Sequence, residues 1–346
     1  MDTSVSEVKP VKRVEYIDVL RGIGIFLVAF GHSIAVLEQP VNRAILSFHM
    51  PLFFFVTGLL FYGKKVKGKS FITFIKHKIF TILVPQITCS VLYFLFSILV
   101  YVIIAKTHRV VDFITFDLFM WFLVVLFLME VVMFLGLRIT DNIKIQIVYM
   151  ILALVLFFAI PEFHKLLGDW FPKALSDYLW RTAEQLFGAL FFGYLGMLTR
   201  PLIEKYRNCT KLHGIGLFGY CLVVLFAQFN EPIGMYVNDY GNRFVFIAVA
   251  ILGIMSTVDI SFLLEKSSLF SYLGKNSIII YVTHFKVLDV IFIGVHKLFD
   301  INIRLFPGFL IVFPLLMLIE IPVIWFANKY VPFLFGKQKI KLNKKA

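Results

Sequence analysis

Apolar stretches of about 20 residues recur along this chain, and short polar segments separate them. A helix of that length crosses the hydrocarbon core of a bilayer, so each stretch predicts a membrane span. About ten spans are expected, at 17–37, 44–62, 79–104, 113–137, 145–160, 183–199, 212–229, 244–260, 276–298 and 308–327. Because 145–160 is short, a re-entrant or tilted segment is the alternative there. The pattern predicts an all-α, polytopic transmembrane bundle.

Composition and charge add an orientation to this bundle. Of the 346 residues, 60% are hydrophobic and the mean hydropathy is +0.88, far above the apolar share of a soluble domain. One side of the predicted bundle carries 22 Lys and Arg residues and the other side carries 9. The positive-inside rule then places both termini in the cytoplasm, in a multi-pass protein of the cytoplasmic (inner) membrane. The net charge of +13 is spread over short loops and termini, which favours an anionic lipid surface and argues against nucleic acid.

The expected organisation is a cytoplasmic tail at 1–16, a transmembrane domain at 17–330 and a basic cytoplasmic tail at 331–346. The first apolar run follows basic residues, as in a signal peptide, but it contains ionisable residues and no A-x-A-like cleavage site follows. We interpret it as an uncleaved span. The outer segment 161–182 suits either an interfacial segment or a plain loop. The three cysteines are odd in number and lack metal-type spacing, so neither a disulfide framework nor a metal site is expected.

Three ionisable residues share one face of the first predicted span. Asp18, Arg21 and His32 lie within about 60° of one another on a helical projection. Ionisable residues are costly in lipid, so this face is expected to point into protein or water and to belong to a functional site. The alternative for Asp18 and Arg21 is an i,i+3 ion pair with a snorkelling arginine.

Histidines of the first two spans are expected at one depth. His32 precedes the outer end of its span by about five residues and His49 follows the outer start of its span by about five, so both lie about 8 Å below the outer surface. A short connection makes these helices antiparallel neighbours. Two imidazoles at one depth favour a reactive site over the alternative, a packed contact between helices.

Polar groups also interrupt the last two predicted spans. Lys286 and Asp289 are three residues apart and are expected to neutralise each other. Glu320 has no such local partner, and a buried carboxylate must be protonated or find a distant cation or imidazole. We therefore expect a functional role for Glu320, although the predicted span limits place it about 10 Å deeper than His32.

Five segments together resemble the acyltransferase type three family. They are Arg21 followed after ten residues by His32, FHMPLFFFVTGLLF at 48–61, WFL at 121–123, LGKNSIIIYVTH at 273–284 and EIP at 320–322. They occur in family order over nearly the whole chain. Members are integral membrane enzymes that transfer acyl groups, usually acetyl, from acyl-CoA to sugar hydroxyls of surface glycans. The resemblance implies acyl-CoA, a sugar or glycan acceptor and the lipid bilayer as partners.

The resemblance also implies roles for residues. His32 resembles the family's essential histidine, Arg21 its basic partner, and Glu320 the glutamate of a late E-x-P motif. Three further positions are typical of members and are expected at the site, namely His49, Trp121 and His284. Trp121 and its neighbour Asp117 would equally suit an aromatic belt and a membrane rim. Many relatives continue into an SGNH hydrolase-like domain, whereas about ten residues follow Gly336 here, which favours a stand-alone transferase.

Acyl transfer to a hydroxyl needs a base for the hydroxyl proton and donors or positive charge for the developing oxyanion. His32 is the predicted base, with Glu320 or His49 as its partner. Arg21, with Asp18 beside it, is predicted to bind the phosphates of acetyl-CoA, because arginine forms bidentate contacts with phosphate. No metal is needed for this chemistry.

A transporter or flippase for a lipid-linked glycan is the competing hypothesis, because polar groups inside spans also mark substrate pathways. Such a protein would need no acyl-CoA. The Arg21 and His32 pair and the basic segment 63–78 favour the enzyme. Transfer of succinyl or another acyl group is a variant of the enzyme hypothesis. The acceptor sugar, its hydroxyl position and the oligomeric state depend on shape, which the sequence does not reveal.

Overall fold

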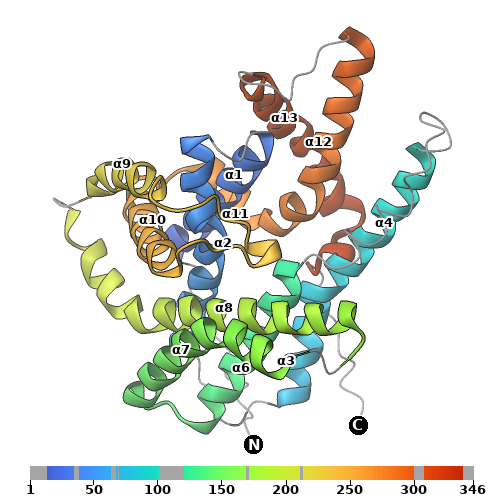
Figure 1. Cartoon of the computed structure of the whole chain (residues 1–346). Coiled ribbons are helices and arrows are strands. Elements are labelled where there is room, and N and C mark those ends of the chain that lie inside the picture. The colour runs from blue at the N-terminus through green and yellow to red at the C-terminus, as the bar shows by residue number, and fades with distance from the viewer. Residues whose placement is uncertain are drawn as a thin grey trace, which may run out of the picture.

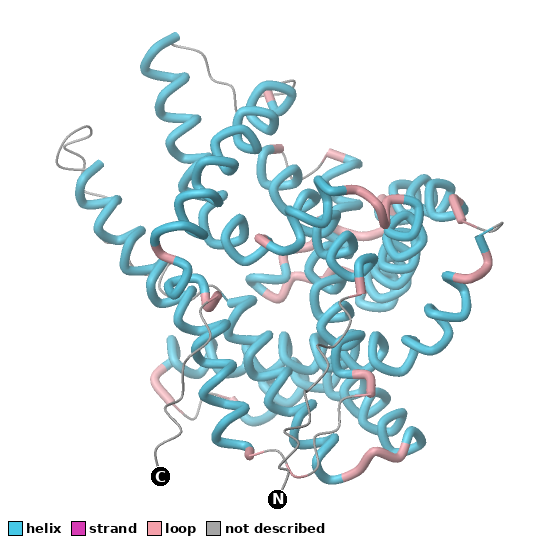
Figure 2. The backbone as a smooth tube through the Cα atoms, turned by 180° about the vertical axis from the view of Figure 1, so that it is seen from behind, coloured by secondary structure: helices cyan, strands magenta, loops and turns pink. Residues whose placement is uncertain are grey.

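The structure, a computed structural model, describes residues 14–34, 39–63, 68, 70–100, 121–168, 171–210, 213–299 and 308–337. Within these ranges nearly every residue belongs to a helix, and Figure 2 shows helices joined by loops. The described residues form no strand, only an isolated bridge between Gly234 and Asp239. Eight described helices are long and apolar enough to cross a bilayer. The prediction of an all-α, polytopic membrane bundle is therefore confirmed.

The described helices follow the predicted order of spans. They are α1 (Glu15–Ser33), α2 (Pro40–Phe61), α3 (Phe71–Lys78), the π-helix η1 (Ile79–Leu83), α4 (Val84–Val100), α6 (Trp121–Ile139), α7 (Ile143–Leu167), α8 (Lys173–Arg207), α9 (Ile215–Ala227), the 3₁₀ turn η4 (Met235–Val237), α10 (Arg243–Leu263), α11 (Ser268–Lys275), α12 (Ser277–Phe299), α13 (Phe309–Tyr330) and the 3₁₀ turn η5 (Pro332–Phe335). In Figure 1, α8 crosses the lower part of the view beside α7, and α12 and α13 stand in the upper part.

Several predicted limits are wrong. The expected short span at 145–160 is the 25-residue helix α7, and most of the expected outer segment 161–182 belongs to α7 and α8. The expected loop at 63–78 is helical from Phe71 onward. Hydropathy marks where a helix leaves lipid, whereas capping residues set where it ends. The side chain of Asn142 caps the start of α7, and Gly168, with φ at +67°, follows its end.

Helix α9 has only 13 residues, about 20 Å in length, and is too short to cross the hydrocarbon core alone. A side chain of α10 satisfies its first backbone groups. The carboxylate of Asp259 accepts hydrogen bonds from the backbone N–H groups of Gly214 and Gly216, both at 2.8 Å, and from the hydroxyl of Tyr206 at 2.8 Å. Unsatisfied N–H groups are costly in apolar surroundings, so buried Asp259 allows α9 to begin inside the bundle.

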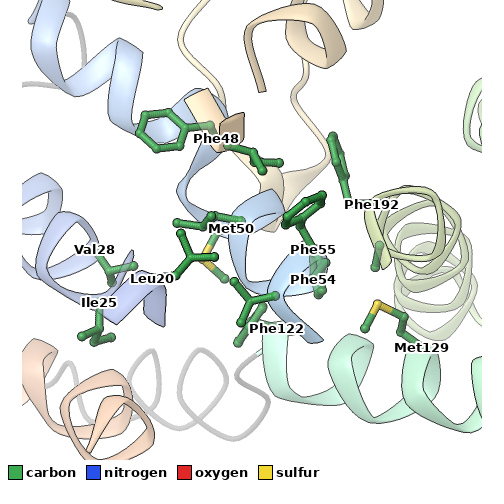
Figure 3. Packing of buried hydrophobic residues seen from close by; sticks show 14 of the residues in the cluster. Leu20, Ile25, Val28, Phe48, Met50, Phe54, Phe55, Phe122, Met129 and Phe192 are labelled. Atoms are coloured by element: carbon green, nitrogen blue, oxygen red, sulfur yellow. The ribbon is translucent and has the colours of Figure 1, made fainter. Parts of the chain in front are cut away.

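Helices α1 and α2 form the centre of the bundle. They have the largest buried share among the eight candidate spans. Figure 3 shows their apolar side chains packed against α6 and α8, with Leu20, Ile25 and Val28 from α1, Phe48, Met50, Phe54 and Phe55 from α2, Phe122 and Met129 from α6, and Phe192 from α8. This core fixes the two helices that carry His32 and His49.

Two pairs of glycines allow helices to touch through their backbones. A methyl group added to Gly274 of α11 would overlap the carbonyl oxygen of Asp18, and one added to Gly22 would overlap that of Phe270. Helix α11 therefore lies directly on the first half of α1. Gly58 of α2 and Gly196 of α8 make an equally close crossing. Only residues without a side chain permit such approaches.

Candidate active site

Three histidines from three helices meet at one place in the bundle. The ring centre of His32, at the end of α1, lies 6.4 Å from that of His49 on α2 and 5.2 Å from that of His284 on α12. His49 and His284 are buried, with 5% and 0% exposure, and His32 is partly buried. The structure thus brings His32 and His49 together as expected. We call His32, His49 and His284 the imidazole site.

Two of these rings are held in one tautomer by their own helices. Nδ1 of His49 lies 2.8 Å from the carbonyl oxygen of Ile45, and Nδ1 of His284 lies 2.9 Å from that of Ile280. A carbonyl only accepts, so each Nδ1 carries the hydrogen and each Nε2 keeps a lone pair. Nε2 of His284 is buried and has no hydrogen-bond partner among the described residues. It is therefore an acceptor available to a donor that enters the site.

Aromatic side chains form one wall of the imidazole site. The ring of Phe285 lies 4.5 Å from His32 and 4.3 Å from His284. Tyr281 lies one helical turn below His284, with ring centres 6.2 Å apart, and it contacts Phe122 at 5.2 Å. Phe122 is buried, whereas Phe285 is 39% exposed, so this wall stands partly at the surface of the described bundle.

Trp121 reaches this wall only indirectly. It is the first residue of α6, and its ring contacts Phe54 at 6.5 Å and Phe122 at 6.1 Å. The rings of Phe122 and Tyr281 therefore lie between Trp121 and His284. Its expected neighbour Asp117 lies outside the described residues.

Glu320 forms hydrogen bonds with Thr283 of α12 and makes no contact with His32. Its carboxyl group is fully buried on α13, and both oxygens lie 2.9 Å from the hydroxyl oxygen of Thr283. Among the described residues it has no other hydrogen-bond or ion-pair partner. Of the two partners considered for His32, only His49 is adjacent to it. Thr283 directly precedes His284, so Glu320 is linked to the imidazole site through the backbone of α12.

Asp18 and Arg21 lie one turn apart in the first half of α1. Asp18 is buried with 5% exposure and Arg21 is partly buried. Helix α11 crosses α1 here, through the contact between Gly274 and the carbonyl of Asp18. Arg21 is eleven residues before His32, a rise of about 16 Å along the helix. The structure thus separates the predicted phosphate-binding residues from the imidazole site along a single helix.

The two predicted charges of α12 pair with each other. Nζ of Lys286 lies 3.4 Å from a carboxylate oxygen of Asp289 and also lies over the ring of Tyr93 on α4, 5.2 Å from its centre. The predicted neutralisation of this pair is confirmed. No group of three or more histidine, cysteine or carboxylate side chains within the described ranges is arranged to hold a metal ion.

Sequence reasoning missed Thr283 and Phe285, which flank His284. Their position was the available signal, because residues adjacent to a histidine on a helix point about 100° to either side of it. Thr283 contacts Glu320 of α13, and Phe285 contacts His32 of α1.

Comparison with protein families gives one result for this chain. The model of the acyltransferase type three family, described as an acyltransferase domain, matches residues 14–327. Neither the curated proteins nor the solved structures contain a significant match. The match covers all seven residues predicted for the site.

Proposed function

Because the chain belongs to the acyltransferase type three family, we propose that it transfers an acetyl group from acetyl-CoA to a sugar hydroxyl of a surface polysaccharide or lipid-linked glycan. Family membership makes the chain an acyltransferase, which decides between the enzyme and the transporter left open by the sequence. The donor, the acceptor and the location in the cytoplasmic membrane are parts of the proposal. Transfer of succinyl or another acyl group is its variant.

The imidazole site is the observation that carries this proposal. In the reaction His32 takes the proton of the acceptor hydroxyl while its oxygen forms a bond to the acyl carbon, and the bond from that carbon to sulfur breaks. His49 and His284 present Nε2 lone pairs beside His32. These lone pairs orient the hydroxyl and stabilise the proton after its transfer, which gives His49 a catalytic role and His284 a role in binding the acceptor.

Arg21 and Asp18 are assigned to the donor. Acetyl-CoA carries phosphates at one end and the reactive thioester at the other, joined by a flexible arm. The separation of about 16 Å between Arg21 and His32 suits a donor whose phosphates remain near the cytoplasmic end of α1. Trp121, whose ring contacts Phe54 and Phe122, is assigned to binding of the acceptor.

The test is mass spectrometry of surface glycans from a host strain that lacks this chain. We expect that the wild-type gene restores a mass increment of one acetyl group per modified sugar and that His32→Ala does not. His164→Ala is the matched control, because that ring stacks on Trp180 away from the imidazole site. Normal acetylation with His32→Ala would refute the site assignment. An increment of another mass would identify a different acyl group.

A further inference from the structure

Polar side chains lie on the buried face of α4. Gln86, Ser90 and Tyr93 are all buried, and they recur at the three- and four-residue spacing of one helical face. Val91 and Leu95 on the opposite face are exposed, so that face is apolar and turned outward. Helix α4 also follows the π-helix η1, and π turns are frequent at functional sites. Because polar groups are costly inside a membrane, this buried polar face needs an explanation.

Gln86 differs from the other buried glutamines in its bonding. It is 3% exposed, and its side-chain oxygen Oε1 has no hydrogen-bond partner among the described residues. The side-chain nitrogen of Gln146 donates to the carbonyl of Thr140 at 2.7 Å. That of Gln185 donates to the carbonyl of Met235 at 2.9 Å. These two amides hold a neighbouring segment in place, whereas no such bond is described for Gln86.

The unpaired oxygen of Gln86 indicates a ligand. A buried acceptor without a donor lowers the stability of a fold, and an apolar side chain of the same shape would avoid that loss. A donor that arrives with a ligand explains such a group. The amide of glutamine offers one acceptor and two donors, so its complement is a group that carries both an N–H and a carbonyl.

Gln86 lies between the levels of the two ends proposed for the donor. Nζ of Lys286 lies 5.2 Å from the ring centre of Tyr93, which puts these residues at one level of the bundle. Gln86 is seven residues before Tyr93, about 10 Å toward the side on which α1 begins. Lys286 is two residues beyond His284, about 3 Å in the opposite direction. Gln86 is therefore about 7 Å below the imidazole site, against about 16 Å for Arg21.

Acyl-CoA carries the complementary groups at this level. Between its phosphates and its thioester lies the pantetheine arm, which contains two secondary amides, each with an N–H donor and a carbonyl acceptor. The phosphates are assigned to Arg21 and the thioester to His32, so the amides of the arm must lie at an intermediate depth. Gln86 has both the matching chemistry and the matching depth.

We propose that Gln86 binds the pantetheine arm of acyl-CoA by pairing with one of its amides. Oε1 of Gln86 accepts from the N–H of that amide, and the side-chain nitrogen donates to its carbonyl. This inference rests on the proposed function and deepens it, because it assigns a residue to the part of the donor between its two ends. Gln86 is a binding residue and takes no part in proton transfer.

Calorimetry with coenzyme A on the full chain in lipid nanodiscs tests the proposal. Gln86→Met keeps the length of the side chain and removes the amide. We expect the Kd for coenzyme A to rise about tenfold, because two hydrogen bonds are lost. The unfolding midpoint without ligand should stay equal or rise, because the unpaired oxygen is gone. A lower midpoint with an unchanged Kd would show a structural role and overturn the proposal.

Gln146→Met is the matched control. It removes an equally buried amide whose oxygen is also unpaired, but whose nitrogen bonds to Thr140. The control should therefore lower the unfolding midpoint and leave the Kd for coenzyme A unchanged. Equal effects of the two substitutions on the Kd would overturn the assignment of Gln86 to the donor.

A fragment of coenzyme A separates the arm from the phosphates. Its nucleotide portion carries the phosphates and lacks the arm, so we expect Gln86→Met to bind this fragment as the wild type does. Equal weakening of the fragment and of coenzyme A would overturn the proposal. A wild type that binds coenzyme A through Gln86 but transfers no acetyl group would reject the proposed function alone. A wild type that does not bind coenzyme A would reject both.

Discussion

Two polar groups of this bundle differ in whether their ionisable side chains form ion pairs. Near the start of α10, Arg243 forms an ion pair with Glu184 of α8 and donates to the carbonyl of Phe157, while Asn238 donates to Glu184 at 2.6 Å. In the imidazole site, by contrast, the buried Nε2 of His284 has no described partner. Paired charges hold helices in place, whereas a buried lone pair without a partner costs the fold some stability and is available to a substrate donor. We therefore call Arg243, Glu184 and Asn238 the structural network.

Replacing His32 is expected to give the largest difference between the imidazole site and the structural network. His32→Ala removes the proposed base, so kcat/KM should fall about 10³-fold while thermal unfolding stays near that of the wild type. Activity with labelled acetyl-CoA and the unfolding midpoint in detergent measure the two quantities. A large drop in the unfolding midpoint would instead place His32 with the structural residues.

The structural network should show the opposite behaviour. Arg243→Ala leaves Glu184 buried without its cation, which costs about 3–5 kcal/mol of stability. Glu184→Gln in the Arg243→Ala background is the matched control, because it removes the unpaired charge and should recover part of the loss. Denaturant unfolding measures both. An Arg243→Ala protein as stable as the wild type would contradict the comparison.

A substitution at the contact between α1 and α11 should change both stability and activity. Gly274→Ala introduces a methyl group that overlaps the backbone of Asp18, with an expected cost of about 1–3 kcal/mol and a raised KM for acetyl-CoA through displacement of Arg21. Gly294→Ala is the control, because nothing lies within 4 Å of a methyl group there. Equal behaviour of the two variants would show that α11 adapts without moving α1.

The smallest expected effect concerns the two ring nitrogens of His284. Glutamine places a polar atom near the position of Nε2, and asparagine places one near Nδ1. If the lone pair of Nε2 is the functional atom, His284→Gln should keep about tenfold more activity than His284→Asn. Initial rates at saturating acetyl-CoA measure this. The reverse order would mean that the bond from Nδ1 to Ile280 matters more.

Much of this site follows from local sequence patterns. The apolar period places the spans, and the counts along two neighbouring helices place His32 and His49 at one depth, where the structure has them adjacent. The i,i+3 spacing of Lys286 and Asp289 was sufficient to predict their pairing. These predictions succeed because helical geometry alone determines which residues of a segment share a face or a level.

Other features depend on which helices become neighbours. The partner of Glu320 is Thr283 because α13 packs on α12, and the extent of α7 and α8 depends on capping residues that hydropathy does not detect. The cap of α9 comes from Asp259, more than forty residues later in the chain. No local period carries this information, since it arises from contacts between distant segments.

The sequence by itself determined that this chain is a helical membrane protein of the acyltransferase type three family, because span length, charge bias and motif order are properties of local segments. The resemblance placed His284 among the expected site residues, and only the tertiary structure decided that its ring lies 5.2 Å from that of His32 and that Glu320 contacts Thr283. The physical reason is that packing fixes the rotation and depth of each helix against its neighbours, and hydropathy leaves both undetermined.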